Sequence, residues 1–93
     1  MGKNNLFSDI PKNISEEIIE TLIKSEHVKI ERIVSKGQKS PENFWYDQDQ
    51  NEWVIVLKGS ASIGFENGNI TELQQGDYIN IPAHKKHRVE KTD

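Results

Sequence analysis

The chain has 93 residues, which allows one domain with one thin hydrophobic core, and it has no cysteine, which excludes disulfides, thiolate metal ligands and thiol nucleophiles. Its 12 basic and 15 acidic residues are interspersed and give a net charge of -3, so we expect no nucleic-acid partner. Because no apolar run could span a bilayer and residues 1–5 lack the hydrophobic stretch of a secretory signal, we expect a cytoplasmic protein with no membrane partner.

The N-terminal part of the chain divides into an arm and a predicted helix. Residues 1–12 are polar and have no periodicity, so we interpret them as an arm, and we assign residues 13–93 to the single domain. The domain begins with apolar residues at helical spacing, namely Ile14, Ile18, Ile19, Leu22 and Ile23. With Asn13 or Ser15 as the N-cap, this spacing predicts one short amphipathic α-helix over about 15–25.

After this helix the apolar period falls to two, which is typical of β-strands. Asn67-Gly68 lies between two such segments and predicts a β-hairpin with a primed turn, in which Gly68 has a positive φ. Many short strands separated by turn residues indicate an all-β sandwich, jelly roll or small barrel. The predicted strands are 28–34, 44–48, 52–58, 60–65, 70–73, 77–81 and 87–91.

The segment 52–58 is apolar on both of its faces. Trp53, Ile55 and Leu57 alternate with Val54 and Val56, whereas a strand with one face in water would alternate apolar with polar residues. One face can fill the barrel, and the other needs the predicted helix or a second subunit as cover. We therefore expect a homodimer.

Two spacings in the second half of the chain are typical of a known family. Glu52 is followed after six residues by Gly59, and Gly76 is followed after five by Pro82, with His87 five positions further on. With these spacings the chain resembles the cupin superfamily from about Ile18 to its end. The aromatic segment Phe44-Trp45-Tyr46-Asp47-Gln48 and the segment Ile81-Pro82-Ala83-His84 are similar to those of small single-domain bacterial cupins. The resemblance implies an all-β fold, the cupin double-stranded β-helix or jelly-roll barrel.

The resemblance also implies a divalent transition metal held by two histidines and a glutamate of the first motif and a histidine of the second. Glu52 matches the glutamate and His87 matches the last histidine, but no histidine stands where the family has its pair. A metal with one imidazole and one carboxylate from the protein has few strong bonds. We therefore expect only weak metal binding, through Glu52, His87 and the amide of Gln48.

The positions of the missing histidine pair depend on the length of the loop before Glu52. The pair falls at Tyr46 and Gln48 or at Trp45 and Asp47, and strand alternation allows only one of these pairs to face the pocket. We favour Tyr46 and Gln48, which gives a predicted ligand-binding set of Tyr46, Gln48, Glu52 and His87.

Two further histidines are given no ligand role. His84 occupies a predicted turn, where histidine tolerates a positive φ, and His27 lies at the end of the predicted helix.

Three hypotheses for function remain open on the sequence. The first is a cupin whose polar pocket binds a small molecule without chemistry. The second is a metal-dependent enzyme on a small substrate, such as a dioxygenase, isomerase or lyase. The third is a dimeric structural module with a vestigial pocket. One fold supports many chemistries, so the resemblance alone does not choose between them.

Overall fold

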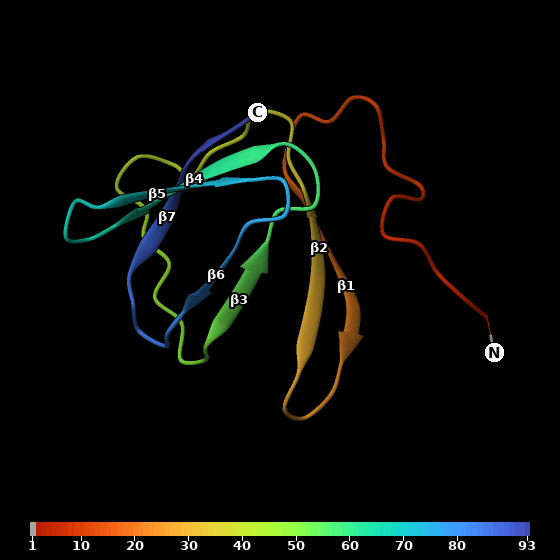
Figure 1. Cartoon of the computed structure of the whole chain (residues 1–93), viewed down its shortest axis with the longest axis horizontal. Helices are drawn as coiled ribbons and strands as arrows, with labels where there is room; N and C mark the ends of the chain where they lie inside the picture. The colour runs from red at the N-terminus through yellow and green to blue at the C-terminus, as the bar shows by residue number, and fades with distance from the viewer. Residues whose placement is uncertain (1) are drawn as a thin grey trace. The chain divides into compact units, whose positions relative to one another are not determined.

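The computed structural model describes residues 2–93 (Figure 1), and every regular element among them is a β-strand. The predicted all-β class is confirmed. The chain divides into two compact units, the first ending at Lys36 and the second formed by Gly37–Asp93. No helix in residues 2–93 has the length and apolar character needed to cross a membrane.

The first unit contains one antiparallel hairpin. Strand β1 (Ile18–Lys24) pairs with β2 (Lys29–Val34), and Glu20 lies opposite Arg32. The guanidinium of Arg32 forms an ion pair of 2.8 Å with Glu20 and donates to the carbonyl oxygens of Leu6 and Ser8 at 3.1 and 2.6 Å. One arginine side chain therefore ties the segment before the hairpin to both of its strands.

The helix predicted over 15–25 is wrong, because most of this segment forms strand β1. A register shift between Thr21 and Ile23 places Ile23 opposite Ile30, whereas Ile19 lies opposite Ile33. The helical spacing is a property of the sequence, in which Ile18, Ile19, Leu22 and Ile23 fit one helical face, and the irregularity at Leu22 accommodates the same residues in a strand without strict alternation. The β-branched side chains of the segment favour the extended form, and pairing with β2 satisfies its backbone.

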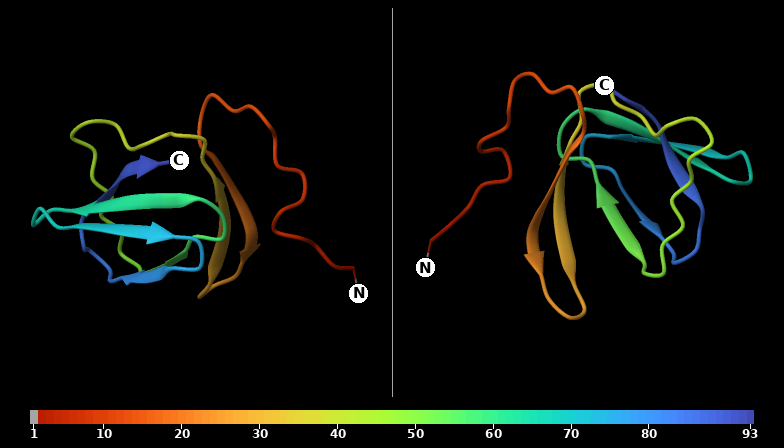
Figure 2. Two further views of the ribbon diagram at one scale, coloured as in Figure 1. Left: turned by 45° about the horizontal axis from the view of Figure 1, so that its top comes forward. Right: turned by 180° about the vertical axis from the view of Figure 1, so that it is seen from behind.

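The second unit consists of two antiparallel sheets, one with the strand order β5-β4-β7 and the other formed by β3 and β6. Figure 2 shows these strands from two further sides. The core contains the buried Ile63, Leu73 and Ile81, from β4, β5 and β6. The strands are β3 (Glu52–Ile55), β4 (Ser60–Phe65), β5 (Ile70–Gln74), β6 (Tyr78–Ile81) and β7 (His87–Thr92). Partly buried residues packed against the core are Val54, Val56, Phe65, Ile79 and Val89.

The predicted hairpin between β4 and β5 is present, but its turn differs from the prediction. Gly68 has a φ of +90°, whereas Asn67 is not among the residues with positive φ, as a primed Asn-Gly turn would require. The Gly68 N–H donates to the Phe65 carbonyl at 2.9 Å, and the Phe65 N–H donates to the Asn69 carbonyl at 2.8 Å. These bonds match a three-residue loop in which glycine supplies the left-handed position.

Two predicted strands are shorter than expected. The strand predicted over 52–58 ends at Ile55, and the segment 44–48 contributes only an isolated bridge between Tyr46 and His87. The Ser40 N–H also donates to the Val89 carbonyl at 2.9 Å. The segment before β3 therefore runs beside β7 through a few hydrogen bonds rather than as a full strand.

Candidate functional site

Glu52 and His87 approach each other from the two sheets of the second unit. Glu52 begins β3 and lies opposite the buried Ile81, and His87 begins β7 and lies opposite Phe65, which packs on the core. Directly opposed residues of antiparallel strands point to the same face, so both side chains point inward. The distance from His87 Nε2 to Glu52 Oε1 is 3.6 Å.

Tyr46 lies on the same face as His87. Its N–H donates to the His87 carbonyl at 2.7 Å, and the His87 N–H donates back to the Tyr46 carbonyl at 3.1 Å. The two rings stack with centroids 5.4 Å apart and planes at 24°. The Phe65 ring lies 6.4 Å from the imidazole. Two aromatic side chains therefore flank the histidine.

Trp45 and Asp47 have other partners. The guanidinium carbon of Arg88 lies 5.9 Å from the centre of the Trp45 ring, and Asp47 Oδ1 lies 3.0 Å from His84 Nδ1. Of the two alternative pairs for the pocket, the sequence favours Tyr46 and Gln48 over Trp45 and Asp47. The structure places Tyr46 of the favoured pair against His87.

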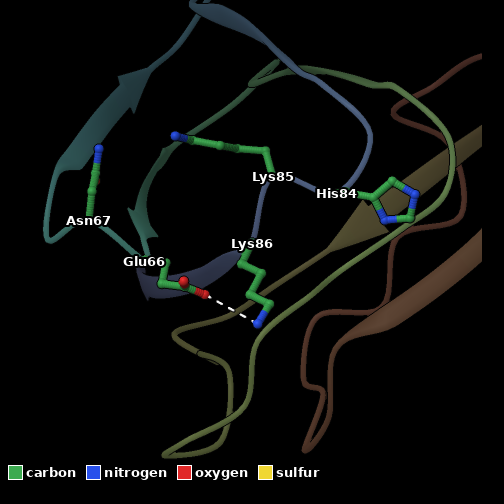
Figure 3. Close-up of a pocket in the computed structure, with 5 residues that line it drawn as sticks. All are labelled: Glu66, Asn67, His84, Lys85 and Lys86. Carbon is green, nitrogen blue, oxygen red and sulfur yellow. Dashed lines mark ion pairs between the residues drawn. The ribbon is translucent and has the colours of Figure 1, made fainter.

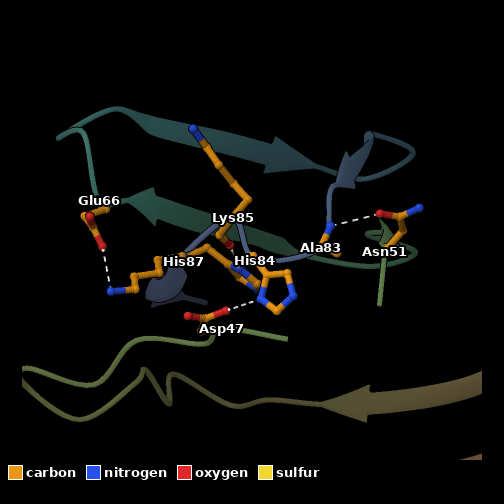
Figure 4. Close-up of polar contacts among 8 residues, drawn as sticks. Asp47, Asn51, Glu66, Ala83, His84, Lys85 and His87 are labelled. Atoms are coloured by element: carbon orange, nitrogen blue, oxygen red, sulfur yellow. Dashed lines mark hydrogen bonds and ion pairs between the residues drawn. The ribbon is translucent and has the colours of Figure 1, made fainter. Parts of the chain in front are cut away.

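Gln48 is exposed, and among residues 2–93 no hydrogen bond joins its side chain to Glu52 or His87. Its backbone carbonyl accepts the N–H of His84 at 2.7 Å. Asn51 Oδ1 accepts the N–H of Ala83 at 2.9 Å (Figure 4). These two hydrogen bonds connect the loop between β6 and β7 to the segment before β3. His84 has a φ of +63° in this loop, so it occupies the kind of turn position that its sequence context predicts.

The hydrogen bonding of His87 fixes which ring nitrogen carries the proton. His87 Nδ1 lies 2.8 Å from the Lys85 carbonyl oxygen, which can only accept, so Nδ1 is the donor. Nε2 is then an acceptor in the neutral ring and faces the Glu52 carboxylate. The His87 side chain is 6% exposed and that of Glu52 is 35% exposed. The imidazole is therefore the inner group of the site and the carboxylate the outer one.

The residues present do not form a full metal site. In the described part of the chain, residues 2–93, no group of three or more His, Cys, Asp or Glu side chains could hold a metal ion. Glu52 and His87 supply two donors. At the favoured positions of the family's histidine pair the chain has Tyr46, whose ring is stacked on His87, and Gln48, which is exposed. Transition metals in proteins usually have three or four protein ligands. This donor set does not fit a tightly held transition metal.

Sequence reasoning missed two contributors to this region. Phe65 forms one wall of the His87 site, and its alternation with Ile63 in the sequence would have placed it on the inner face. Lys85 holds the imidazole through its backbone carbonyl and lines an adjacent open cavity with a volume of about 320 Å³. The basic run 84–88 was the available signal for this cavity.

The fold, the motif spacings and the paired Glu52 and His87 together define a cupin. The family model described as Cupin domain matches residues 31–93, and the chain belongs to this family. No curated protein gives a significant match to the chain.

Two solved structures resemble the chain. One, from Ralstonia eutropha JMP134, is described as a putative mannose-6-phosphate isomerase; it is 45% identical with a TM-score of 0.94, and the match covers 100% of this chain and 87% of that one. The other is a cupin superfamily protein from Desulfitobacterium hafniense DCB-2, which is 21% identical with a TM-score of 0.75, over 89% of this chain and 72% of that one. The second similarity supports the fold alone.

Proposed function

We propose that this cupin binds a small, hydroxyl-bearing molecule at the side-chain cluster of Glu52, His87, Tyr46 and Phe65, which we call the His87 pocket. The observation that carries the proposal is the buried imidazole of His87, whose Nδ1 donates to the Lys85 carbonyl and whose Nε2 faces the Glu52 carboxylate. A separation of 3.6 Å is too long for a good hydrogen bond. A ligand hydroxyl can donate to neutral Nε2 or to the carboxylate, and a hydrogen bond to either group would add to the affinity.

The relative from Ralstonia suggests which ligand to test first. Its description names mannose 6-phosphate as the substrate, so a phosphorylated sugar is a reasonable first probe for this chain. A hexose carries several hydroxyl groups, and the rings of Tyr46 and Phe65 offer apolar walls beside the imidazole.

The alternative function is an isomerase of a small substrate. It is favoured by the fixed tautomer of His87, because a neutral Nε2 beside a carboxylate can accept and return a proton during sugar isomerisation. Interconversion of mannose 6-phosphate and fructose 6-phosphate by the dialysed protein would support this alternative. No interconversion, with and without added zinc or manganese, would favour binding without chemistry.

Calorimetric titration with mannose and mannose 6-phosphate tests the proposed pocket. Glu52→Gln and His87→Phe should each weaken binding about tenfold or more, because each removes a hydrogen bond to a charged or buried group. His27→Phe is the matched control, since the His27 side chain is 85% exposed. Unchanged affinity in His87→Phe, or no binding of either sugar by the wild type, would contradict the proposal.

The metal content of the purified protein follows from the same donor set. We propose that untagged protein carries no stoichiometric transition metal after dialysis against a mild chelator, and that added metal binds weakly through Glu52 and His87, with Gln48 as a further donor. Elemental analysis with native mass spectrometry measures both the metal and any bound small molecule. Stoichiometric zinc, iron, nickel or manganese after dialysis would overturn this and support a metal-dependent enzyme.

A further inference from the structure

An open cavity lies beside the His87 pocket, between the β4–β5 turn and the β6–β7 loop. Its volume is about 320 Å³, within the range of small-molecule sites, and it is lined by Glu66, Asn67, His84, Lys85 and Lys86. Figure 3 shows Lys85 extended toward the side where Asn67 lies and Lys86 directed at Glu66. Three of the five lining side chains are basic, although the protein as a whole carries a net charge of -3.

Lys85 provides a cation that has no carboxylate partner in the part of the chain that the structure describes. Its ammonium group lies 5.6 Å from the centre of the Phe65 ring, and among residues 2–93 no carboxylate is within ion-pair distance of it. Lys86 pairs with Glu66 at 3.4 Å, and both side chains are about half exposed. Exposed ion pairs contribute little to stability, so Lys86 can exchange this partner for an anion at small cost.

The chemistry of the lining fits a compact anion with several acceptor oxygens. Two ammonium groups offer three donors each, and the side-chain amide of Asn67 adds two more. A phosphate group has enough oxygens to accept from all three side chains, although Lys85 and Lys86 are directed to different sides of the cavity (Figure 3), so contact with both requires Lys86 to turn away from Glu66. Glu66 and Asp47 at or near the cavity disfavour an extended polyanion such as nucleic acid, because it would bring further negative charge against them.

Lys85 lines the cavity and also contacts His87 and Phe65 of the neighbouring site. The Lys85 carbonyl accepts from His87 Nδ1, and the Lys85 ammonium lies over the same Phe65 ring that flanks the imidazole. A ligand that contacts both His87 and the basic side chains would pass beside Phe65 and Lys85.

We propose that this cavity is an anion subsite in which Lys85, Lys86 and Asn67 bind the phosphate group of the ligand. The assignment of a phosphorylated ligand rests on the proposed function, whereas binding of phosphate itself depends only on the cavity.

Titration of the full chain with inorganic phosphate tests the subsite. Amide chemical shifts are followed by NMR at constant ionic strength, with chloride as the exchanged anion, because screening affects all surface charges. We expect saturable changes concentrated at residues 66–67 and 84–86. Lys85→Gln should weaken phosphate binding about five- to tenfold, since it removes a charge-assisted hydrogen bond at a partly exposed site. Lys85→Arg should retain phosphate binding, because it keeps the positive charge. This result would show that the loss in Lys85→Gln comes from the missing charge and not from a disturbed fold.

The matched control is Lys58→Gln, which makes the same change of charge at an exposed position outside the cavity. It should leave phosphate affinity within about twofold, as expected for an exposed charge acting at a distance. Equal weakening by Lys58→Gln and Lys85→Gln, absence of saturation, or shift changes elsewhere would overturn the subsite.

Comparison of mannose with mannose 6-phosphate separates this proposal from the proposed function. Tighter binding of the phosphorylated sugar in the wild type, with the difference lost in Lys85→Gln, supports the subsite. Equal binding of both sugars overturns the subsite and leaves the His87 pocket in place. Binding of inorganic phosphate without binding of either sugar keeps the subsite and contradicts the proposed function.

Discussion

Replacement of His87 by alanine measures how much the candidate pocket contributes to stability. His87 is 5% exposed, its ring stacks on Tyr46, and its Nδ1 donates to the Lys85 carbonyl. An aromatic contact of this kind contributes about 0.5–1.5 kcal/mol and a hydrogen bond about 1 kcal/mol. Removing both, and leaving a cavity, should lower the free energy of unfolding by about 2–3 kcal/mol. For a domain of this size that is a fall in Tm of roughly 8–24 °C.

His87→Phe separates the two contributions, because it keeps a buried ring beside Tyr46 and loses only the hydrogen bond. It should cost about 1 kcal/mol. Urea unfolding followed by tryptophan fluorescence is the assay, since Trp45 and Trp53 both lie in the unit that contains the site. His27→Ala should change the free energy of unfolding by less than about 0.5 kcal/mol, as for most exposed positions. If His87→Ala were equally neutral, the packing argument for the pocket would be refuted.

Three further predictions concern the β4–β5 turn, Glu17 in the first unit and the exposed Trp53 on β3. Gly68→Val should lower the free energy of unfolding by roughly 1 kcal/mol in urea unfolding, because φ is +90° there, and Gly68→Asn should cost less. Partial burial raises the pKa of Glu17, so its contribution to stability is greatest below the ordinary carboxyl pKa and is lost as pH rises through the raised value. Glu17→Gln should therefore be more stable than wild type at neutral pH and equal to it in acid; the reverse order would contradict the assignment. We also propose a homodimer, because Trp53 is 59% exposed and lies 5.5 Å from the exposed Tyr78 ring. Sedimentation at tens of micromolar should give a dimer that Trp53→Glu dissociates, and a monomeric wild type would rule the dimer out.

The sequence predicts the class of fold well because its signals are local. Alternation of apolar and polar residues and the turn at Gly68 depend on neighbours in the chain, and both led to strands that the structure contains. The helix prediction failed at a place where local signals conflict. The apolar residues Ile18, Ile19, Leu22 and Ile23 have the spacing of a helix, and only pairing with β2, which accommodates a register shift between Thr21 and Ile23, decides between the two forms.

For the candidate site too, the sequence predicts some features and the tertiary structure decides others. Motif spacing singles out Glu52 and His87 from the sequence, while their binding role stays a prediction. Tertiary structure brings them to 3.6 Å, because cross-strand pairing with Ile81 and Phe65 turns both side chains inward. It also sets Tyr46 against His87, through a bridge that strand alternation alone could not assign.

Lys85 and its cavity depend on tertiary structure most of all. The sequence shows only that Lys85 lies in a basic run near His87. Whether such a run is neutralised depends on the carboxylates that the fold brings near it, and here Glu66 from another turn pairs with Lys86 and leaves Lys85 without a carboxylate partner among residues 2–93. Composition and spacing determine which chemical groups the chain carries, but a hydrogen bond or an ion pair forms only between atoms within about 4 Å of each other. The partners of each group are therefore decided only where the folded chain sets distant segments side by side.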